Sequence, residues 1–139
     1  MDYSKQITYS TSAESLFTAI TQNLDQWWGK TDTSVEKKGD EFKVSFGHAF
    51  WKFRVSEFTP NEKLTWECVD GQPEFEHEWV GTKVHWNISG DVEKTQLSFT
   101  HEGLTPSFEC YDVCAPTWDM FLTTSLRSFV EKGKGMSHS

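Results

Sequence analysis

His101 is the residue of this sequence whose type and position most suggest acid–base chemistry, because an imidazole titrates near neutral pH. It follows Leu97 and Phe99 at alternate positions of a predicted strand, which places it on the apolar face. There it could orient a ligand or exchange a proton. It could also be a histidine anchored by hydrogen bonds at the strand end. The pattern favours this second interpretation, because buried polar groups usually have structural partners.

The other histidines and the cysteines do not form a recognisable catalytic or metal site. His48 lies at a predicted strand connection and His77 lies between two glutamates, so both are expected in solvated loops. Cys110 and Cys114 could share a helix face near His101, but zinc needs three or four ligands at set spacing. We therefore predict buried thiols, with no metal and no other cofactor.

Motifs of several common enzyme classes are missing from the sequence. The chain has no Gly-x-Ser-x-Gly elbow, no dinucleotide fingerprint and no P-loop. Glu102 and Glu109 could flank a cavity entrance, but no second titratable group stands at a required spacing from them. The sequence therefore predicts no catalytic residue.

Charge and hydropathy exclude other classes of protein. Thirteen Lys and Arg against 21 Asp and Glu give a net charge of −8, which does not suit a protein that neutralises phosphates. No apolar run approaches the ~20 residues of a transmembrane helix, and no secretory signal is visible. Three cysteines are an odd and sparse set. We expect a cytoplasmic protein that neither binds nucleic acid nor inserts into membranes.

Aromatic content is the most informative part of the composition. Seven Trp, three Tyr and eleven Phe make up 15% of the chain. Such large rings are difficult to pack without gaps, because protein interiors are otherwise dense. The composition therefore leaves two alternatives, a solid core filled with rings or a shell of rings around a pocket.

Periodicity predicts the elements that must position these rings. A Thr11-x-x-Glu14 capping box predicts a short helix through Leu24, and a second short helix is expected over Asp25–Gly29. A helical stripe from Cys114 predicts a long last helix, with Pro116 in its first turn and Gly133 at its end. Apolar and polar residues alternate over 3–9, 42–46, 51–56, 64–68, 83–88 and 96–101, which predicts strands.

This order of elements predicts one α+β domain over 1–133, followed by a flexible tail at 134–139. About six antiparallel strands would form a curved sheet with one apolar face. The last helix is the only predicted element long enough to cover that face. The space between them is where the aromatic rings point.

This layout resembles the helix-grip fold of the START-like (SRPBCC) superfamily, and within it the family named after the activator of the heat-shock-protein-90 ATPase. The resemblance covers nearly the whole chain and depends on the order and spacing of short motifs. These are Trp27-Trp28, Thr59-Pro60, Leu64-Thr65-Trp66, Glu78-Trp79, Gly81-Thr82, Thr95-Gln96-Leu97, Thr100-His101-Glu102-Gly103-Leu104, Trp118, Phe121-Leu122, Ser125-Leu126 and Gly133.

The resemblance implies a cavity between the sheet and the long helix, which in relatives holds lipids, sterols, polyketides or other apolar molecules. The residues expected to line it are Phe46, Trp51, Phe53, Trp66, Trp79, Trp86, Phe99, His101, Trp118, Phe121 and Leu122. Indole N–H groups and His101 would supply its few polar contacts. We expect binding of a small hydrophobic or amphipathic molecule without chemical change.

Two alternatives remain open at this level. A cyclase or isomerase could use the same cavity with His101 as acid or base. A cochaperone could stimulate a chaperone ATPase, although the family's namesake uses a further domain for which this chain has no room. The sequence does not determine the oligomeric state.

Overall fold

In a computed structural model of the chain, the described residues are 2–46, 49–71, 80–90, 92–104 and 111–135, excluding the side chains at 46, 49 and 111–114. Seven strands form one antiparallel sheet in the order β1-β7-β6-β5-β4-β3-β2. The strands are β1 (Tyr3–Tyr9), β2 (Lys30–Thr31), β3 (Glu41–Phe46), β4 (Ala49–Thr59), β5 (Lys63–Gly71), β6 (Lys83–Gly90) and β7 (Thr95–Glu102). The α+β helix-grip prediction is confirmed. The strand beyond the predicted six is β2, which is too short to show alternation.

The alternating sequence pattern becomes two distinct faces of the sheet. In β7, Leu97, Phe99 and His101 are buried on one face, whereas Gln96 and Glu102 are exposed. Cross-strand pairs such as Trp86 with Phe99 place large side chains in rows on the buried face. The β4–β5 ladder shifts register at two places, and such irregularities increase local bending and twist.

Helix α1 (Ala13–Thr21) begins one residue later than the capping-box prediction required. Its N-cap is Ser12, whose hydroxyl accepts a hydrogen bond from the Ser15 amide at 3.0 Å. Thr11 has another role, because its carbonyl accepts a hydrogen bond from the Thr95 hydroxyl at 2.8 Å. Thr11 and Ser12 are adjacent, and both residue types are common N-caps. The structure uses Ser12, which has the extended backbone that a cap needs.

Three consecutive helical segments form the C-terminal rod: α3 (Tyr111–Met120), the π-helix η1 (Phe121–Ser125) and α4 (Leu126–Lys132). Pro116 lies inside α3 rather than in its first turn, because the helix starts earlier than the apolar stripe. Gly133 ends α4 with φ of 81°, a left-handed conformation that glycine adopts without steric cost.

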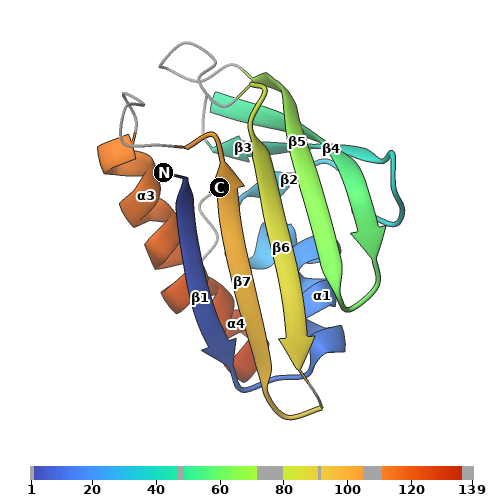
Figure 1. The fold of residues 1–139 in the computed structure, drawn as a ribbon, viewed down its shortest axis with the longest axis vertical. Coiled ribbons are helices and arrows are strands. Elements are labelled where there is room, and N and C mark those ends of the chain that lie inside the picture. Colours follow the sequence, from blue (N-terminus) through green and yellow to red (C-terminus); the bar gives the residue numbers. More distant parts are fainter. Residues whose placement is uncertain (1, 47–48, 72–79, 91, 105–110, 136–139) are drawn as a thin grey trace.

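The helices α1, α3 and α4 all lie on the same side of the curved sheet (Figure 1). Helix α2 (Leu24–Trp27) follows α1 and brings two tryptophans to the same side. The buried residues between the sheet and the helices form one hydrophobic cluster. Within the described parts of the chain, no helix has the length and apolar character needed to cross a membrane.

Candidate functional site

Aromatic rings fill the interior between the sheet and the C-terminal rod. We call this group the aromatic layer; its members are Trp28, Phe42, Phe53, Trp66, Trp86, Phe99 and Trp118. All seven are at most 2% exposed. Ring-to-ring contacts run from strand to strand and then to helix α3, with centroids 4.7 Å apart for Phe99 and Trp118. The described rings therefore pack against one another as one hydrophobic cluster.

Trp28 connects the two walls of this interior. Its ring stacks on Trp66 of the sheet, with centroids 5.5 Å apart and an interplanar angle of 19°. It also stacks on Trp118 of the rod, at 5.3 Å and 23°. Trp28 comes from neither wall, because it is the residue that ends the short helix α2. A flat ring from a connecting segment thus occupies the space between sheet and rod.

The residues expected to line a cavity are buried wherever the structure describes them. These are Trp51, Phe53, Trp66, Trp86, Phe99, His101, Trp118, Phe121 and Leu122. Trp51 lies so close to Gly71 that a Cβ there would meet the ring at 2.3 Å. The side chain of Phe46 and the whole of Trp79 lie outside the described residues. For all eleven residues the role of lining a ligand cavity stays a prediction.

Sequence reasoning missed Trp28 as part of the site, although it noted the Trp27-Trp28 pair. In the structure α2 ends between them, and the two rings lie nearly parallel, with centroids 6.2 Å apart and an interplanar angle of 22°. The Trp27 indole N–H donates to the Ala19 carbonyl of α1 at 2.8 Å, and the Trp27 ring also contacts Trp86. The adjacent pair Trp27-Trp28 was therefore the available signal that Trp28 belongs to the site. It could be used only together with the position at which helix α2 ends.

His101 is a neutral, structurally bound histidine. The Trp118 indole N–H donates to its Nδ1 at 3.1 Å, so Nδ1 carries no proton and Nε2 is protonated. That Nε2 lies 2.8 Å from the Thr82 hydroxyl and donates to it. Burial lowers the pKa of His101 from 6.5 to about 3, an effect that the Asp2 carboxylate partly opposes. Both ring nitrogens are occupied, which supports the anchoring interpretation.

Hydrogen bonds with the edge strand β1 and with α2 fix the C-terminal rod in place. The Tyr9 hydroxyl donates to the Leu122 carbonyl in the π-helix at 2.7 Å, and burial raises the pKa of this phenol. The Ser125 hydroxyl donates to the Trp27 carbonyl at 2.6 Å. Near the N-terminus of β1, the Tyr3 hydroxyl donates to the Asp119 carboxylate. These contacts set the separation between rod and sheet at several points.

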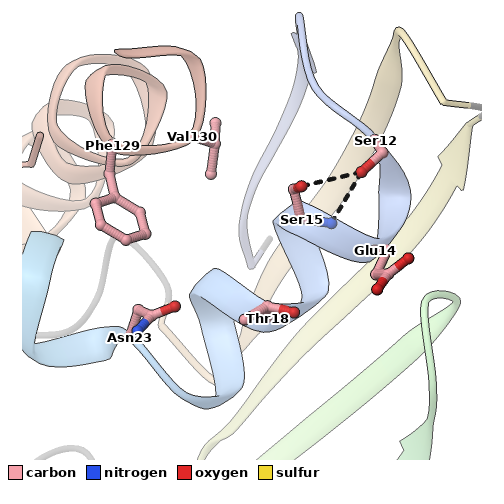
Figure 2. A pocket seen from close by; sticks show the side chains of 7 residues that line it. All are labelled: Ser12, Glu14, Ser15, Thr18, Asn23, Phe129 and Val130. Carbon is pink, nitrogen blue, oxygen red and sulfur yellow. Dashed lines mark hydrogen bonds between the residues drawn. The ribbon is translucent and has the colours of Figure 1, made fainter. Parts of the chain in front are cut away.

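A second concave region lies outside the core, between α1 and α4. It is an open hollow of about 460 Å³. Figure 2 shows Phe129 and Val130 of α4 facing the polar side chains of α1. We call it the outer groove; it is lined by Ser12, Glu14, Ser15, Thr18, Asn23, Phe129 and Val130. Two of its hydroxyls, Ser12 and Ser15, already bond to each other at 3.0 Å.

Several other candidates from the sequence lie outside the described residues, namely His48, His77, Glu109 and Cys110, together with the side chain of Cys114. Cys68 is buried, and burial raises its pKa to about 12, so its thiol is not a nucleophile at neutral pH. Within the described part of the chain, no three His, Cys, Asp or Glu side chains are grouped to hold a metal ion.

Solved structures with the same fold cover nearly the whole chain. The solution structure of the Aha1 dimer from Colwellia psychrerythraea is 23% identical, covers 97% of this chain and 99% of its own, and has a TM-score of 0.81. Protein MLL2253 from Mesorhizobium loti is 18% identical over 93% of this chain and 97% of its own, with a TM-score of 0.76. CalU16 from Micromonospora echinospora is 20% identical over 96% and 75%, with a TM-score of 0.70.

No curated protein sequence gives a significant match. The family model described as "Activator of Hsp90 ATPase homolog 1-like protein" matches residues 10–131. That range runs from the end of β1 through the sheet and the aromatic layer to the last turn of α4. The chain therefore belongs to the Activator of Hsp90 ATPase homolog 1-like family.

Proposed function

We propose that this protein binds a small hydrophobic or amphipathic molecule between the sheet and the C-terminal rod, and releases it chemically unchanged. The family and its fold support this class of ligand. The ligand would enter the aromatic layer at the place that the Trp28 ring occupies. The sparse cysteines support the cytoplasm as the compartment.

The stacked position of Trp28 is the observation that carries this proposal. A ring at 5.5 Å from Trp66 and 5.3 Å from Trp118 makes offset aromatic contacts with both walls. Trp28 ends a four-residue helix and does not belong to the sheet or to the rod. A flat aromatic ligand could replace this ring while preserving the same stacking. Among apolar ligands, aromatic polyketide-like molecules fit better than flexible lipids or sterols.

Binding without catalysis agrees with the state of His101. An acid or base at neutral pH needs a pKa near 7 and access to the substrate. His101 has a pKa of about 3 and both nitrogens hydrogen-bonded. A cyclase or isomerase would therefore need a different proton-transfer residue.

Titration with three ligand classes tests the proposal, namely flavonoid-like aromatics, sterols and fatty acids, with tryptophan fluorescence and the thermal midpoint Tm as readouts. Flat aromatics should quench fluorescence and raise Tm more than the other two classes. The matched control is Phe129→Ala in the outer groove, which should bind with unchanged affinity. Absence of any response across the panel in the wild-type protein would overturn the proposal.

The family match favours one second candidate, stimulation of a chaperone ATPase. This activity would use the protein surface rather than the aromatic layer. Addition of saturating protein to an Hsp90-type chaperone should then raise its ATP hydrolysis rate. An unchanged rate at saturation would remove this candidate and would not affect the ligand-binding proposal.

A further inference from the structure

Two buried indole nitrogens in the aromatic layer have no hydrogen-bond partner. They are Nε1 of Trp66 and Nε1 of Trp86, and both side chains are 0% exposed. Other tryptophans behave differently, since Trp27 donates to the Ala19 carbonyl and Trp118 donates to His101. A buried donor without an acceptor is unfavourable, and such groups are rare enough in folded proteins to need an explanation.

The two donors lie next to each other on the buried face of the sheet. Trp66 on β5 pairs with Val84, and Trp86 on β6 pairs with Leu64, which places the two tryptophans diagonally across adjacent strands. Their ring centroids are 5.2 Å apart. Trp66 also stacks on Trp28, so this pair adjoins the place proposed for the ligand.

The rings that contact Trp66 and Trp86 offer these donors no oxygen acceptor. Trp66 is surrounded by the rings of Phe42, Phe53 and Trp28, and Trp86 packs on Phe99 and other rings. None of these rings carries an oxygen acceptor. An acceptor from outside the chain would therefore remove an unfavourable feature of the free protein when it binds.

We infer that the ligand of the aromatic layer carries a neutral oxygen acceptor, such as a ketone, on a flat apolar body, and that Trp66 and Trp86 donate their N–H groups to it. This inference rests on the proposed function and specifies its ligand class. It predicts that the protein binds an aromatic ketone more tightly than a pure hydrocarbon of the same shape.

A carboxylate is disfavoured by the charges around the layer. A buried anion needs a paired cation to offset its loss of hydration. All thirteen Lys and Arg residues belong to the described parts of the chain, and none of them is buried. His101, the buried base beside Trp118, is neutral at physiological pH, and its Nε2–H donates a hydrogen bond to the Thr82 hydroxyl. Neutral donors match a neutral acceptor.

Fluorenone and fluorene form a matched pair of probes, because they share a flat tricyclic body and differ in a ketone against a methylene. Calorimetric titration of the wild-type protein should give fluorenone at least about fivefold tighter binding than fluorene, the effect of one neutral hydrogen bond. The test is stringent, because water solvates the ketone of fluorenone better than the methylene of fluorene. Transfer from water into an apolar site would by itself favour fluorene.

Trp66→Phe and Trp86→Phe keep an aromatic ring and remove the N–H donor. Each variant, or their combination, should lower the affinity for fluorenone by about fivefold or more and leave fluorene affinity nearly unchanged. The control is Trp27→Phe, which removes an indole donor already bonded to the Ala19 carbonyl; the Trp27 ring contacts Trp28 and Trp86, but its N–H is not one of the two unpartnered donors. It should preserve the preference for fluorenone even where both affinities fall.

The indole N–H resonances of the wild-type protein give a readout that needs no variant to fold. Two of the indole signals should shift downfield on addition of fluorenone and not on addition of fluorene. Equal affinity for both probes, or a preference that survives in the Trp66→Phe/Trp86→Phe protein, would overturn this inference while leaving the proposed function intact. Failure of both probes and of the wider ligand panel would instead overturn the proposed function.

Discussion

The aromatic layer and the outer groove both adjoin the helical rod, but the first is a packed interior and the second is an open hollow. In the aromatic layer, rings from β5, α2 and α3 contact one another and two N–H donors lack partners. In the outer groove the lining is mainly hydroxyl and amide groups, the space is open, and Ser12 and Ser15 bond to each other (Figure 2).

This difference shows why an open hollow is the weaker candidate for a specific site. Water can solvate every polar group in the outer groove, so a ligand there would exchange one set of hydrogen bonds for another of similar strength. In the aromatic layer a ligand would take over the stacking that Trp28 makes and would satisfy two N–H donors that are buried without a partner. We therefore expect specific ligand recognition in the buried aromatic layer rather than in the outer groove, which is open to solvent.

The largest expected effect of a single substitution comes from removing the bridging ring. Trp28→Ala should lower the free energy of unfolding by about 3–5 kcal/mol, because it removes a 2% exposed indole between two packed walls. Urea denaturation measures this loss. Free indole should restore part of the stability, since apolar cavities left by large-to-small substitutions bind small aromatics.

The control for Trp28→Ala is Phe129→Ala in the outer groove, where the ring is only partly buried. Its loss of stability should be much smaller, and added indole should have no effect on it. A loss below about 1 kcal/mol for Trp28→Ala would show that the ring is not part of a packed layer.

His101 provides the next effect in size. His101→Leu should cost about 1–3 kcal/mol, because the buried indole N–H of Trp118 would lose its acceptor. The cost should also depend on pH. Burial holds the pKa of His101 at about 3 in the folded protein, whereas the unfolded chain takes up this proton near 6.5.

Between those two pH values the unfolded chain binds more protons, so wild-type stability should rise with pH from about 3 and level off above about 6.5. Urea denaturation at pH 4.5, 5.5 and 7.5 should show the difference between wild type and His101→Leu growing with pH. A difference that is constant over this range would contradict a buried neutral imidazole. Both proteins keep the residues that hydrogen-bond to His101 or whose charges act on its pKa. These are Thr82, Trp118, Asp2 and His85.

Tyr9→Phe tests how the sheet edge holds the π-helix and should have an intermediate effect of about 1 kcal/mol. In η1 the Leu126 amide donates to the Phe121 carbonyl rather than to Leu122, and the Tyr9 hydroxyl donates to the Leu122 carbonyl. Removing this hydroxyl should speed amide hydrogen exchange within Phe121–Ser125 more than in α3. Equal exchange in both segments would show that Tyr9 does not stabilise the π-helix.

Most of the fold could be predicted from the sequence because two-residue alternation and a helical stripe are strong, repeated signals. The burial of Leu97, Phe99 and His101 on one face followed directly from their spacing. The π-helix could not be predicted, because a spacing of four residues, as between Trp118, Leu122 and Leu126, is compatible with an α-helix as well as with a π-helix. The two-residue strand β2 had too few residues to alternate.

The candidate site could be predicted only in part, for a different physical reason. Sequence pattern placed Trp66, Trp86 and Trp118 on inward faces, but it did not indicate what lies between those faces. That depends on Trp28, whose direction is set by the backbone at the end of α2, with φ of −114° and ψ of −85°. The unpartnered state of the two indole nitrogens likewise depends on three-dimensional packing.

The smallest effects are expected in the outer groove, and they separate its structural role from ligand binding. Ser12→Ala should cost about 1 kcal/mol, because the Ser15 amide at the start of α1 loses its capping acceptor. Thr18→Ala, in the same groove, should change the free energy of unfolding by at most about 0.5 kcal/mol. Neither substitution should alter the affinity for a flat aromatic ligand in calorimetric titration. If Thr18→Ala weakens binding while Trp66→Phe and Trp86→Phe do not, the ligand occupies the outer groove, and recognition depends on exposed hydroxyls rather than on the aromatic layer.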